Sequence, residues 1–373
     1  MLDGGWRVGI DIGGTFTDVV AIGADGQTTR TAKVDTRTDD RVLGLLAALE
    51  AVDLGWRDVT DLVHGTTMVT NAIIENHMAD AALVATRGFS DTLAIGRQNR
   101  RHLYRLDLEP KLKPQIPAGR RFEVDGRLDH DGAELEPMSD ESIARIAAQI
   151  AATGVRSVAV SLMHSYANGA HETRLAEALK KHVPFVALSH RVNPEAREYE
   201  RTATTALSAG LMPLVGSYLD RLEGICPATT HLHLFHSAGG MASSRALRDL
   251  PLALAMSGPA AGVVAASTVA RDIGLGLAIS FDMGGTTTDI CLIRDGHAEV
   301  SSDRELGGRP MRQPMIAVDS IGAGGGSIAR LDHGTLRVGP ESAGSFPGPA
   351  CYGRGGGLPT VSDANLILGY LEP

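Results

Sequence analysis

The chain has 373 residues and a formal net charge of −9, and 43% of its residues are apolar but only 4% are aromatic. This length leaves room for two or three domains with buried cores. The acidic balance, the lack of a dense Lys/Arg cluster and the few aromatic side chains argue against nucleic-acid binding. The three cysteines are widely spaced, which argues against a disulfide framework or a thiolate metal site.

The N-terminus lacks the basic and apolar segments of a signal peptide, so the expected location is the cytoplasm. One uncharged run, residues 250–270, is long enough to span a bilayer, but it contains Pro251 and Pro259. We therefore expect a loop followed by a buried helix of small residues, and no membrane contact.

The first 190 residues alternate strand-like and helix-like segments. A strand, a Gly-Gly turn and a second strand are predicted over residues 8–22, then a strand at 30–34 and a helix at 39–52 capped by Thr38. Strands are predicted at 62–64 and 82–85, with a helix at 68–75 between them. Residues 86–137, rich in proline and arginine, are predicted to be an insertion that supplies a substrate wall. A helix capped by Ser139, a strand at 157–162, a helix at 168–181 and a strand at 185–188 follow.

The second segment, residues 191–373, is predicted to form a second α/β domain. Two helices are expected at 195–209 and 211–223, then a strand at 232–235, a helix after Pro259 and a second Gly-Gly hairpin. The remainder is loop-rich and closes with a helix capped by Ser362. Strands alternating with helices indicate an α/β architecture with a mostly parallel sheet core.

The same eight-residue pattern, D-x-G-G-T-x-T-D, occurs from Asp11 to Asp18 and again from Asp282 to Asp289. Each copy lies between two short apolar runs, which predicts a strand, a glycine turn and a strand. A single copy is as well explained by a tight β-hairpin, but two copies in matching contexts indicate a shared function. Two such halves facing each other would bring both turns to a central cleft.

Glycine accepts positive φ, so a Gly-Gly turn exposes successive N–H groups that together bind anions. Asp11 and Asp282, at the strand ends, suit Mg²⁺, which prefers oxygen ligands. Asp18 and Asp289, on the outgoing strands, either orient the hairpins or contact the ligand. The pattern thus predicts a site for ATP and Mg²⁺ in which the phosphates contact Gly13, Gly14, Thr15, Gly284, Gly285 and Thr286.

Other polar residues have two interpretations each. Thr66 and Thr67 follow a predicted strand and either cap the next helix or contact phosphate or substrate. His64 is either a proton shuttle or a packed histidine. Arg97 and Arg100 either bind a carboxylate or phosphate of the substrate or belong to a solvated basic turn.

A glycine-rich loop at residues 322–327 follows the second hairpin. We expect Gly324 and Gly325 to contact the cofactor, and the alternative is a purely structural turn.

Together with the two hairpins, several further segments resemble the A component of the hydantoinase/oxoprolinase group, over essentially the whole chain. These segments are H-G-T-T-M-V-T-N-A (64–72), G-R-Q (96–98), E-Y-E-R-T (198–202), S-G-P-A-A-G (257–262), G-A-G-G-G-S (322–327) and residues 339–353. The resemblance implies an actin-like ATPase (ribonuclease H-like) fold with two duplicated halves.

The resemblance also implies ATP-dependent opening of a cyclic amide such as a hydantoin, 5-oxoproline or a related lactam. In such proteins the carbonyl oxygen is phosphorylated, and a B-type partner subunit completes the reaction. Asp11, Asp282, Thr15 and His64 are the expected catalytic residues. An oligomer is expected. The alternatives are a ketone carboxylase subunit or a small-molecule kinase of the same superfamily, and a truncated non-catalytic subunit.

The chain departs from the family pattern because the F-G-G-x-G-P stretch expected to contact adenine does not follow the second hairpin. We therefore expect the second ATPase domain to be truncated, which leaves open whether the chain binds ATP by itself.

Overall fold

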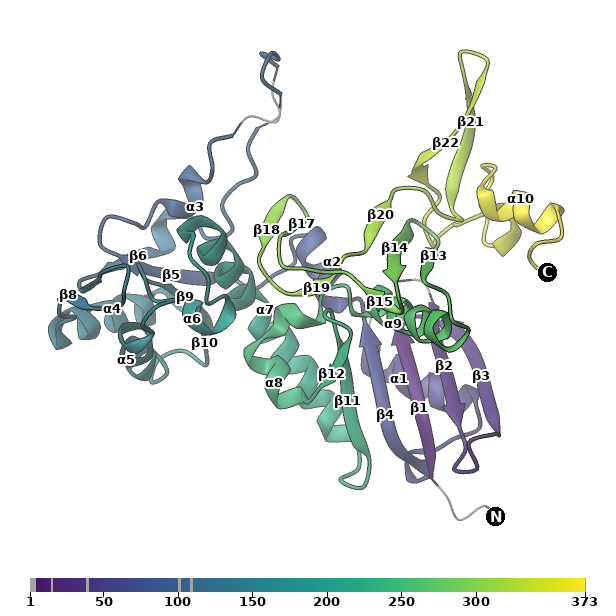
Figure 1. Cartoon of the computed structure of the whole chain (residues 1–373), viewed down its shortest axis with the longest axis horizontal. Coiled ribbons are helices and arrows are strands. Elements are labelled where there is room, and N and C mark those ends of the chain that lie inside the picture. Colours follow the sequence, from purple (N-terminus) through teal and green to yellow (C-terminus); the bar gives the residue numbers. More distant parts are fainter. Residues whose placement is uncertain (1–4, 15, 38–39, 100–101, 108–109, 373) are drawn as a thin grey trace.

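The computed structural model of the chain describes residues 5–14, 16–37, 40–99, 102–107 and 110–372. Within these residues, two bodies built on separate sheets lie side by side and are joined by the long helix α7 (Glu198–Ile225), and a third group of strands lies beside one of them (Figure 1).

The first body contains a six-stranded sheet. In spatial order its strands are β12 (Gly240–Ala242), β11 (His231–His236), β4 (Val59–Thr66), β1 (Trp6–Ile12), β2 (Phe16–Ile22) and β3 (Thr29–Asp35). Strands β1, β2 and β3 form an antiparallel meander, whereas β4 is parallel to β1 and β11 is parallel to β4. Val8, Ile10 and Ile12 of β1 are buried and alternate with exposed residues, so one face of the sheet forms the core. The predicted first hairpin and third strand are confirmed.

Helix α1 (Arg41–Ala51) packs on the core face of this sheet. Its N-cap is Asp40, whose side chain accepts hydrogen bonds from the backbone N–H groups of Val42 and Leu43. Thr38, the predicted cap, lies outside the described residues. The helix begins at Arg41, two residues after the predicted start at residue 39.

The second body contains a four-stranded parallel sheet with two covering helices, α4 (Asp140–Thr153) and α5 (Ala170–Leu179). Its strands, in spatial order, are β10 (Phe185–Leu188), β9 (Ser157–Ser161), β5 (Ala81–Thr86) and β6 (Arg121–Val124). Every residue of β5 and β9 is buried, as expected for parallel strands covered on both faces. Strand β6 belongs to the predicted insertion at 86–137, so that segment contributes to the sheet.

Helix α7 runs without interruption through Gly210 and Pro213, where two helices were predicted. Proline removes a hydrogen-bond donor, but α7 contacts β9 and β10 of one body and α1 and α8 of the other, and this burial outweighs the local preference. Gly210 is required by close approach, because a Cβ there would lie 2.8 Å from Nε2 of Gln115.

The third group begins with α9 (Ser257–Asp272), which packs on the hairpin of β13 (Leu277–Met283) and β14 (Thr288–Arg294). Strands β15 (His297–Ala298) and β20 (Asp319–Ile321) both pair with β14. The hairpin of β21 (Ser327–Asp332) and β22 (Thr335–Ser342) precedes α10 (Val361–Ile367). The cap of α10 is Thr360, in a capping box with Asp363, and not the predicted Ser362.

The shorter elements connect these units. They are η1 (Trp56–Asp58), α2 (Met68–Ile74), α3 (Thr92–Ile95), η2 (Ala118–Arg120), β7 (Arg127–Leu128), β8 (Glu134–Glu136), α6 (Ser189–Val192), α8 (Ser244–Asp249), η3 (Pro251–Leu254), β16 (Val300–Ser301), β17 (Arg304–Leu306), β18 (Arg309–Met311), β19 (Met315–Ile316) and η4 (Ala350–Tyr352). The division near residue 190 stays a prediction, and β11 and β12, beyond it, complete the six-stranded sheet.

One face of β13 is apolar and uncovered within the described residues. Leu277, Ile279 and Phe281 alternate along the strand with exposed fractions of 64%, 66% and 63%. Helix α9 packs on the opposite face, where Ala278 joins a cluster of buried apolar side chains. Helix α9 therefore covers one face of this sheet, whereas the apolar face formed by Leu277, Ile279 and Phe281 is exposed.

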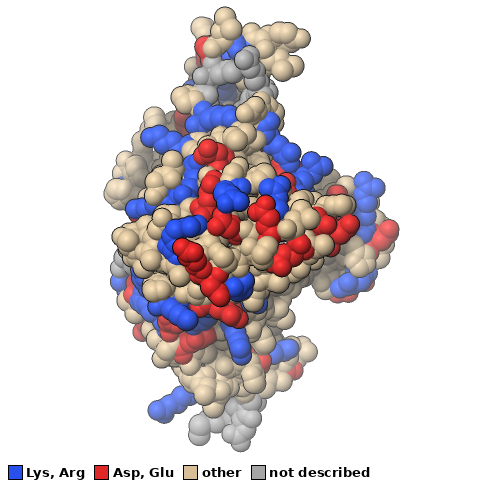
Figure 2. All heavy atoms as spheres, turned by 90° about the vertical axis from the view of Figure 1, so that its left-hand side faces the viewer, with Lys and Arg blue, Asp and Glu red and all other residues tan. Residues whose placement is uncertain are grey.

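The uncharged run at 250–270 folds as η3 followed by α9, as predicted, and the described residues include no helix that is both long and apolar enough to cross a membrane. On the face of the molecule turned to the viewer in Figure 2, acidic and basic side chains are interspersed without a continuous basic patch.

Candidate active site

The two glycine turns have the same local structure. Asp11 is opposite Asp18 in the first hairpin, and Asp282 is opposite Asp289 in the second. The N–H of Gly13 donates to the carbonyl of Phe16 at 3.0 Å, and the N–H of Gly284 donates to the carbonyl of Thr287 at 2.9 Å. The repeat in the sequence is thus a repeat in backbone geometry.

The glycines of the turns are needed for a different reason from the one predicted. None of Gly13, Gly14, Gly284 and Gly285 has its backbone in the left-handed region, so the expectation of positive φ was wrong. A Cβ on Gly13 would lie 2.9 Å from the carbonyl oxygen of Phe16, which excludes a side chain. A Cβ on Gly14 or Gly285 would meet no atom within 4 Å, so both second glycines face open space.

The carboxylate of Asp11 lies against two glycines from other elements. A Cβ on Gly65, near the end of β4, would be 2.8 Å from Oδ1 of Asp11, and one on Gly258, in the first turn of α9, would be 3.2 Å from both oxygens. The N-terminus of a helix carries partial positive charge and favours a nearby anion. Small residues at both positions therefore let the acid of the first turn approach the start of α9.

Hydrogen bonds connect the start of α9 to the end of β4. Oγ of Ser257 donates to the carbonyl of Thr66 at 3.0 Å and accepts from the N–H of Thr66 at 3.3 Å. The N–H of Met256, whose φ is +56°, donates to Oγ1 of Thr70 at 2.8 Å. These bonds hold the helix that connects the first turn to the second hairpin.

The acids of the two turns interact electrostatically. Surrounding protein atoms raise the pKa of Asp11 although its side chain is partly exposed, and the negative charges of Asp18 and Asp282 raise it further. Burial raises the pKa of Asp289, and Asp282 acts in the same direction. The charges of the two turns are therefore close enough to influence each other, and Lys33 partly offsets them at Asp11.

The second acid of each hairpin has a protein partner. Nζ of Lys33 lies 2.6 Å from Oδ1 of Asp18, and Oγ of Ser320 donates to Asp289. These contacts favour orientation of the hairpins over ligand binding for Asp18 and Asp289. Asp11 and Asp282 have no hydrogen bond or ion pair to another described side chain, which leaves their oxygens available.

The segment after β22 lies against the first hairpin. The rings of Tyr352 and Phe16 are 6.3 Å apart in an edge-to-face arrangement, and Nη2 of Arg354 lies 2.9 Å from Oδ1 of Asp35. Sequence reasoning gave neither Tyr352 nor Arg354 a role, and it also missed Gly65, Ser257 and Gly258. The only available signal was the small-residue pattern in H-G-T-T and S-G-P-A-A-G.

The glycine-rich loop contacts the second turn. The N–H groups of Gly325 and Gly326 donate to the carbonyls of Gly284 and Gly285 at 2.9 and 2.7 Å, and the N–H of Gly324 donates to Oγ of Ser327 at 2.9 Å. Because these amides already have partners, the geometry favours the structural alternative, in which the loop supports the second turn. Close approach explains the glycine, since a Cβ on Gly324 would lie 2.7 Å from the backbone of the turn.

His64 is fully buried, with no exposed surface. Its Nδ1 contacts the carbonyl of Ile10 at 3.2 Å, its Nε2 contacts the hydroxyl of Tyr218, and burial lowers its pKa from 6.5 to about 4. A neutral, enclosed imidazole with both nitrogens occupied does not reach a substrate. The geometry therefore favours the packed histidine, and a catalytic role of His64 stays a prediction.

The two threonines after β4 also have structural roles. Oγ1 of the buried Thr66 accepts from the N–H of Met68 at 3.2 Å, and Oγ1 of Thr67 donates to the carbonyl of Ile12 at 3.3 Å. The latter bond joins the start of α2 to the strand that carries Asp11. Direct substrate contact by Thr66 and Thr67 stays a prediction. Thr66 binds an N–H group of α2, whereas Thr67, at the N-cap position, makes no side-chain capping bond and bonds to β1 instead.

Arg97 is held by a carboxylate from α7. Its Nε and Nη2 donate to the two oxygens of Glu200, the first at 2.6 Å, and the side chain of Glu200 is only 10% exposed. The paired guanidinium is thus engaged, and it connects the segment after α3 to the body of the protein. Arg100 and Thr15 lie outside the described residues, so their predicted roles stay predictions.

Three side chains of the E-Y-E-R-T segment at the start of α7, those of Glu200, Arg201 and Thr202, contact different neighbours. Arg201, 1% exposed, donates to Oγ of Ser189 at 2.7 Å, and the hydroxyls of Thr202 and Ser161 are 2.8 Å apart. Together with Glu200 these contacts attach the helix to the four-stranded body. This motif therefore has a structural reason for its composition.

Comparison with known proteins agrees with this architecture. Family models described as "Hydantoinase/oxoprolinase N-terminal region" and "Hydantoinase/oxoprolinase" match residues 7–183 and 201–373. The chain is 36% identical to the caprolactamase subunit alpha of Pseudomonas jessenii, covering 98% of this chain and 55% of that protein. It is 31% identical to the 5-oxoprolinase of Saccharomyces cerevisiae, covering 100% of this chain but 32% of that protein.

Two solved structures resemble the fold. The crystal structure of the Pseudomonas jessenii ATP-dependent caprolactamase superimposes with a TM-score of 0.84, over 98% of this chain and 55% of that one, at 36% identity. A nucleotide-free acetone carboxylase structure gives a TM-score of 0.80, over 99% of this chain and 56% of that one, at 26% identity. These likenesses confirm the predicted α/β fold of the actin-like ATPase type, and the chain spans about half of each matched chain.

Proposed function

Because the chain belongs to the hydantoinase/oxoprolinase family, we propose that it binds ATP and Mg²⁺ between its two turns and takes part in the ATP-dependent opening of a small cyclic amide. The carbonyl oxygen of the amide receives the phosphoryl group, and a B-type partner subunit completes the hydrolysis. The names of the caprolactamase and 5-oxoprolinase relatives support this reaction class.

One observation carries the proposal: two turns of the same geometry carry Asp11 and Asp282 at matching positions, and the charge of Asp282 raises the pKa of Asp11. Carboxylate oxygens that repel one another and lack protein partners fit a divalent cation that prefers oxygen ligands. We assign Asp11 and Asp282 as the residues that would hold Mg²⁺. Bound there, Mg²⁺ neutralises phosphate charge and ATP supplies the phosphoryl group.

The turns themselves suit phosphate oxygens. Gly14 and Gly285 face open space, so their backbones permit an approach that a side chain would block. Thr286 and Thr15 complete the proposed phosphate contacts, whereas the N–H groups of Gly13 and Gly284 already donate within the turns to the carbonyls of Phe16 and Thr287. The start of α9 beside Asp11 adds the positive end of a helix dipole to the same region.

The chemistry explains why phosphoryl transfer is useful. An amide carbonyl is a poor electrophile, and a phosphorylated oxygen becomes a leaving group that exposes the carbon to water. The protein then needs to position the acceptor and stabilise charge, which a fixed pair of turns does without a strong general base. This division of tasks is consistent with the burial of His64.

A second polypeptide is part of the proposal. Leu277, Ile279 and Phe281 form a contiguous apolar face, not scattered exposed side chains. This face lies on the strand that also carries Asp282. Relatives of this chain are named as alpha and gamma subunits. We infer that a B-type subunit covers this face.

The decisive experiment measures ATP binding and phosphate release. We expect the chain with Mg²⁺ to bind ATP by calorimetry, and a B-type subunit plus a hydantoin, 5-oxoproline or lactam to stimulate phosphate release. Asp11→Asn and Asp282→Asn should each lower turnover at least a hundredfold, whereas Asp61→Asn, at the other end of the same sheet, serves as the control. Full activity in both turn variants would exclude this metal site.

The likeness to the acetone carboxylase structure favours one alternative, ketone carboxylation. Phosphate release that depends on a ketone and bicarbonate, and not on a cyclic amide, would select it. Absence of ATP binding with Mg²⁺ present would instead indicate a non-catalytic subunit.

A further inference from the structure

Each of the two hairpins is extended by a third antiparallel strand, and a row of three residues crosses each three-stranded unit. In the first unit, Asp11 of β1 is opposite Asp18 of β2, and Asp18 is opposite Lys33 of β3. Residues directly opposite each other in antiparallel strands have their side chains on the same face of the sheet. Because Asp11 alternates with the buried Ile10 and Ile12, the row lies on the face opposite the core.

The second unit has the same arrangement with one difference. Asp282 of β13 is opposite Asp289 of β14, and Asp289 is opposite Ser320 of β20. Ser320 donates to Asp289 through its hydroxyl, whereas Nζ of Lys33 lies 2.6 Å from the carboxylate of Asp18. The third position of the row therefore carries a cation in the first unit and a neutral hydroxyl in the second, and this difference lies outside the repeated D-x-G-G-T-x-T-D pattern.

The ammonium group of Lys33 is held beside the first turn. Its Nζ lies 5.2 Å from the centre of the Phe16 ring, which is a cation–π distance, and Tyr352 packs edge-to-face against the same ring. The positive charge of Lys33 also opposes the rise in the pKa of Asp11. Lys33 is thus within electrostatic reach of the acid that we assign to the metal.

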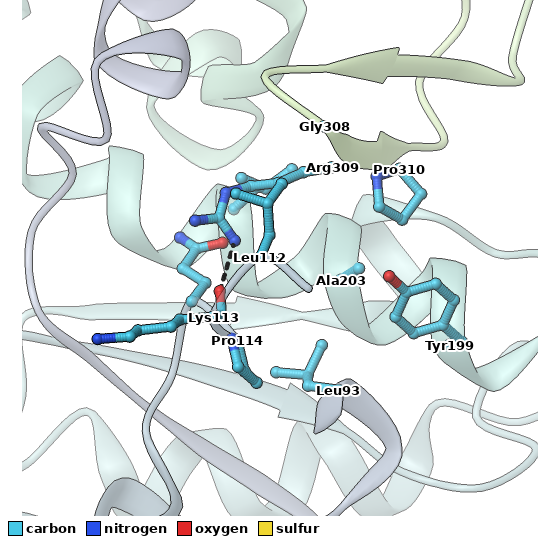
Figure 3. A pocket seen from close by; sticks show the side chains of 11 residues that line it. Leu93, Leu112, Lys113, Pro114, Tyr199, Ala203, Gly308, Arg309 and Pro310 are labelled. Atoms are coloured by element: carbon cyan, nitrogen blue, oxygen red, sulfur yellow. Dashed lines mark hydrogen bonds between the residues drawn. The ribbon is translucent and has the colours of Figure 1, made fainter. Parts of the chain in front are cut away.

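Two other basic side chains have different environments. Arg309 lies in a small cavity between α3, α7 and the β17–β18 hairpin, where it donates to the carbonyl of Lys113 (Figure 3). The volume of this cavity is about 60 Å³, which leaves room for only a few water molecules and excludes a phosphate chain. Arg354 lies beside the first hairpin, but its Nη2 donates to both oxygens of Asp35 at 2.9 and 3.0 Å and so joins the segment after β22 to β3.

The ion pair of Lys33 with Asp18 has little structural value. The two side chains are 57% and 51% exposed. Exposed ion pairs stabilise proteins little, because water competes for both charges and two mobile side chains are immobilised. Lys33 therefore loses little when it exchanges this carboxylate for an anion of higher charge, and a lysine ammonium binds phosphate as a point charge.

We propose that Lys33 binds phosphate at the first turn: on ligand binding its ammonium group leaves Asp18 and pairs with an oxygen of the polyphosphate. The two hairpins then have different tasks. Both present an acid to the metal, but only the first supplies a cation to the phosphates, because Ser320 occupies the equivalent position in the second. This inference rests on the proposed function for the presence of a polyphosphate between the turns.

The test uses inorganic tripolyphosphate with Mg²⁺, titrated into the full chain by calorimetry, because this ligand carries the phosphates of ATP without the adenosine. We expect Lys33→Met to weaken its binding at least tenfold and Lys33→Arg to retain most of the affinity, since arginine keeps the charge. Lys181→Met removes an exposed lysine after α5 and should bind as the wild type does. Unchanged affinity in Lys33→Met overturns the inference.

Asp18→Asn separates a phosphate-binding lysine from a structural ion pair. This substitution removes the carboxylate that competes for Lys33, so we expect it to tighten tripolyphosphate binding several-fold, the opposite of Lys33→Met. Both variants break the same exposed pair, and the melting temperature of each should stay close to that of the wild type. An equal loss of affinity in the two variants would show that the pair acts only by shaping the hairpin, which overturns the inference.

ATP binding and turnover, measured separately, distinguish this inference from the proposed function. ATP binding and turnover that depend on Asp11, with tripolyphosphate affinity unchanged in Lys33→Met, reject the role of Lys33 alone. Tripolyphosphate binding that depends on Lys33, without ATP turnover in the presence of a B-type subunit, rejects the proposed function and leaves an anion site at the first hairpin. A wild-type chain that binds neither ligand overturns both.

Discussion

The buried His64 makes the stability of the protein depend on pH in a defined window. Its pKa is about 4 in the folded protein against 6.5 for an ordinary histidine, because burial disfavours the imidazolium. Between pH 6.5 and 4 the unfolded chain therefore binds more protons at this site than the folded chain. The stabilisation is complete above pH 6.5 and is lost as the pH falls through the window.

The magnitude follows from the two pKa values. At pH 5.0 the unfolded histidine is mostly protonated and the folded one mostly neutral, so this site lowers the free energy of unfolding by about 2 kcal/mol relative to pH 7.5. Urea unfolding of the wild type and of His64→Gln at both pH values isolates this contribution, because glutamine hydrogen-bonds but does not titrate. The variant should lose about 2 kcal/mol less than the wild type on acidification.

An identical pH dependence in the two proteins would refute the reasoning, since it would mean that His64 is solvated or already charged. The same measurement bears on function. If the enclosed histidine takes no part in catalysis, the pH profile of turnover in His64→Gln should retain the shape of the wild-type profile, whatever the change in stability.

Three further predictions concern the turns, the Arg97–Glu200 pair and the metal. Gly13→Ala should lower the free energy of unfolding by roughly 1–3 kcal/mol, because its Cβ would lie 2.9 Å from the carbonyl oxygen of Phe16. Gly14→Ala, at a position that faces open space, should leave the melting temperature unchanged but weaken ATP binding. Equal melting temperatures for the two variants would contradict this prediction. Glu200→Gln should destabilise the fold by about 1–3 kcal/mol, since the carboxylate is 10% exposed and bound by Arg97. A double-mutant cycle with Arg97→Met measures the coupling energy of the pair. Additive effects of the two substitutions would show that the pair contributes little to stability. Removal of Mg²⁺ with EDTA should abolish calorimetric ATP binding, and binding that survives chelation would exclude a metal held by the turns.

The composition of the two hairpins was sufficient to predict their form. Alternating apolar residues such as Val8, Ile10 and Ile12 specify a half-buried strand by themselves, and Gly-Gly between two such runs specifies the turn. Because the pattern occurs twice, the duplication was visible without a structure. Local signals failed where packing outweighed them, as in α7, where burial carries one helix through Pro213.

The environment of each polar residue was decided by contacts between distant parts of the chain. The sequence around His64 is compatible with either an enclosed or a catalytic histidine. The contact of His64 with Tyr218, 154 positions away, favours the enclosed one. Likewise, the sequence does not distinguish Arg97, after α3, from Arg309, at the start of β18. Glu200 neutralises the first, whereas among the described residues the second donates to Asn76 and to the carbonyl of Lys113. The spacing of residues along the chain determines local backbone structure, because the interactions that cause it lie within a few residues. Burial and charge pairing depend instead on which distant segments meet. Those contacts form only when the two bodies pack around α7.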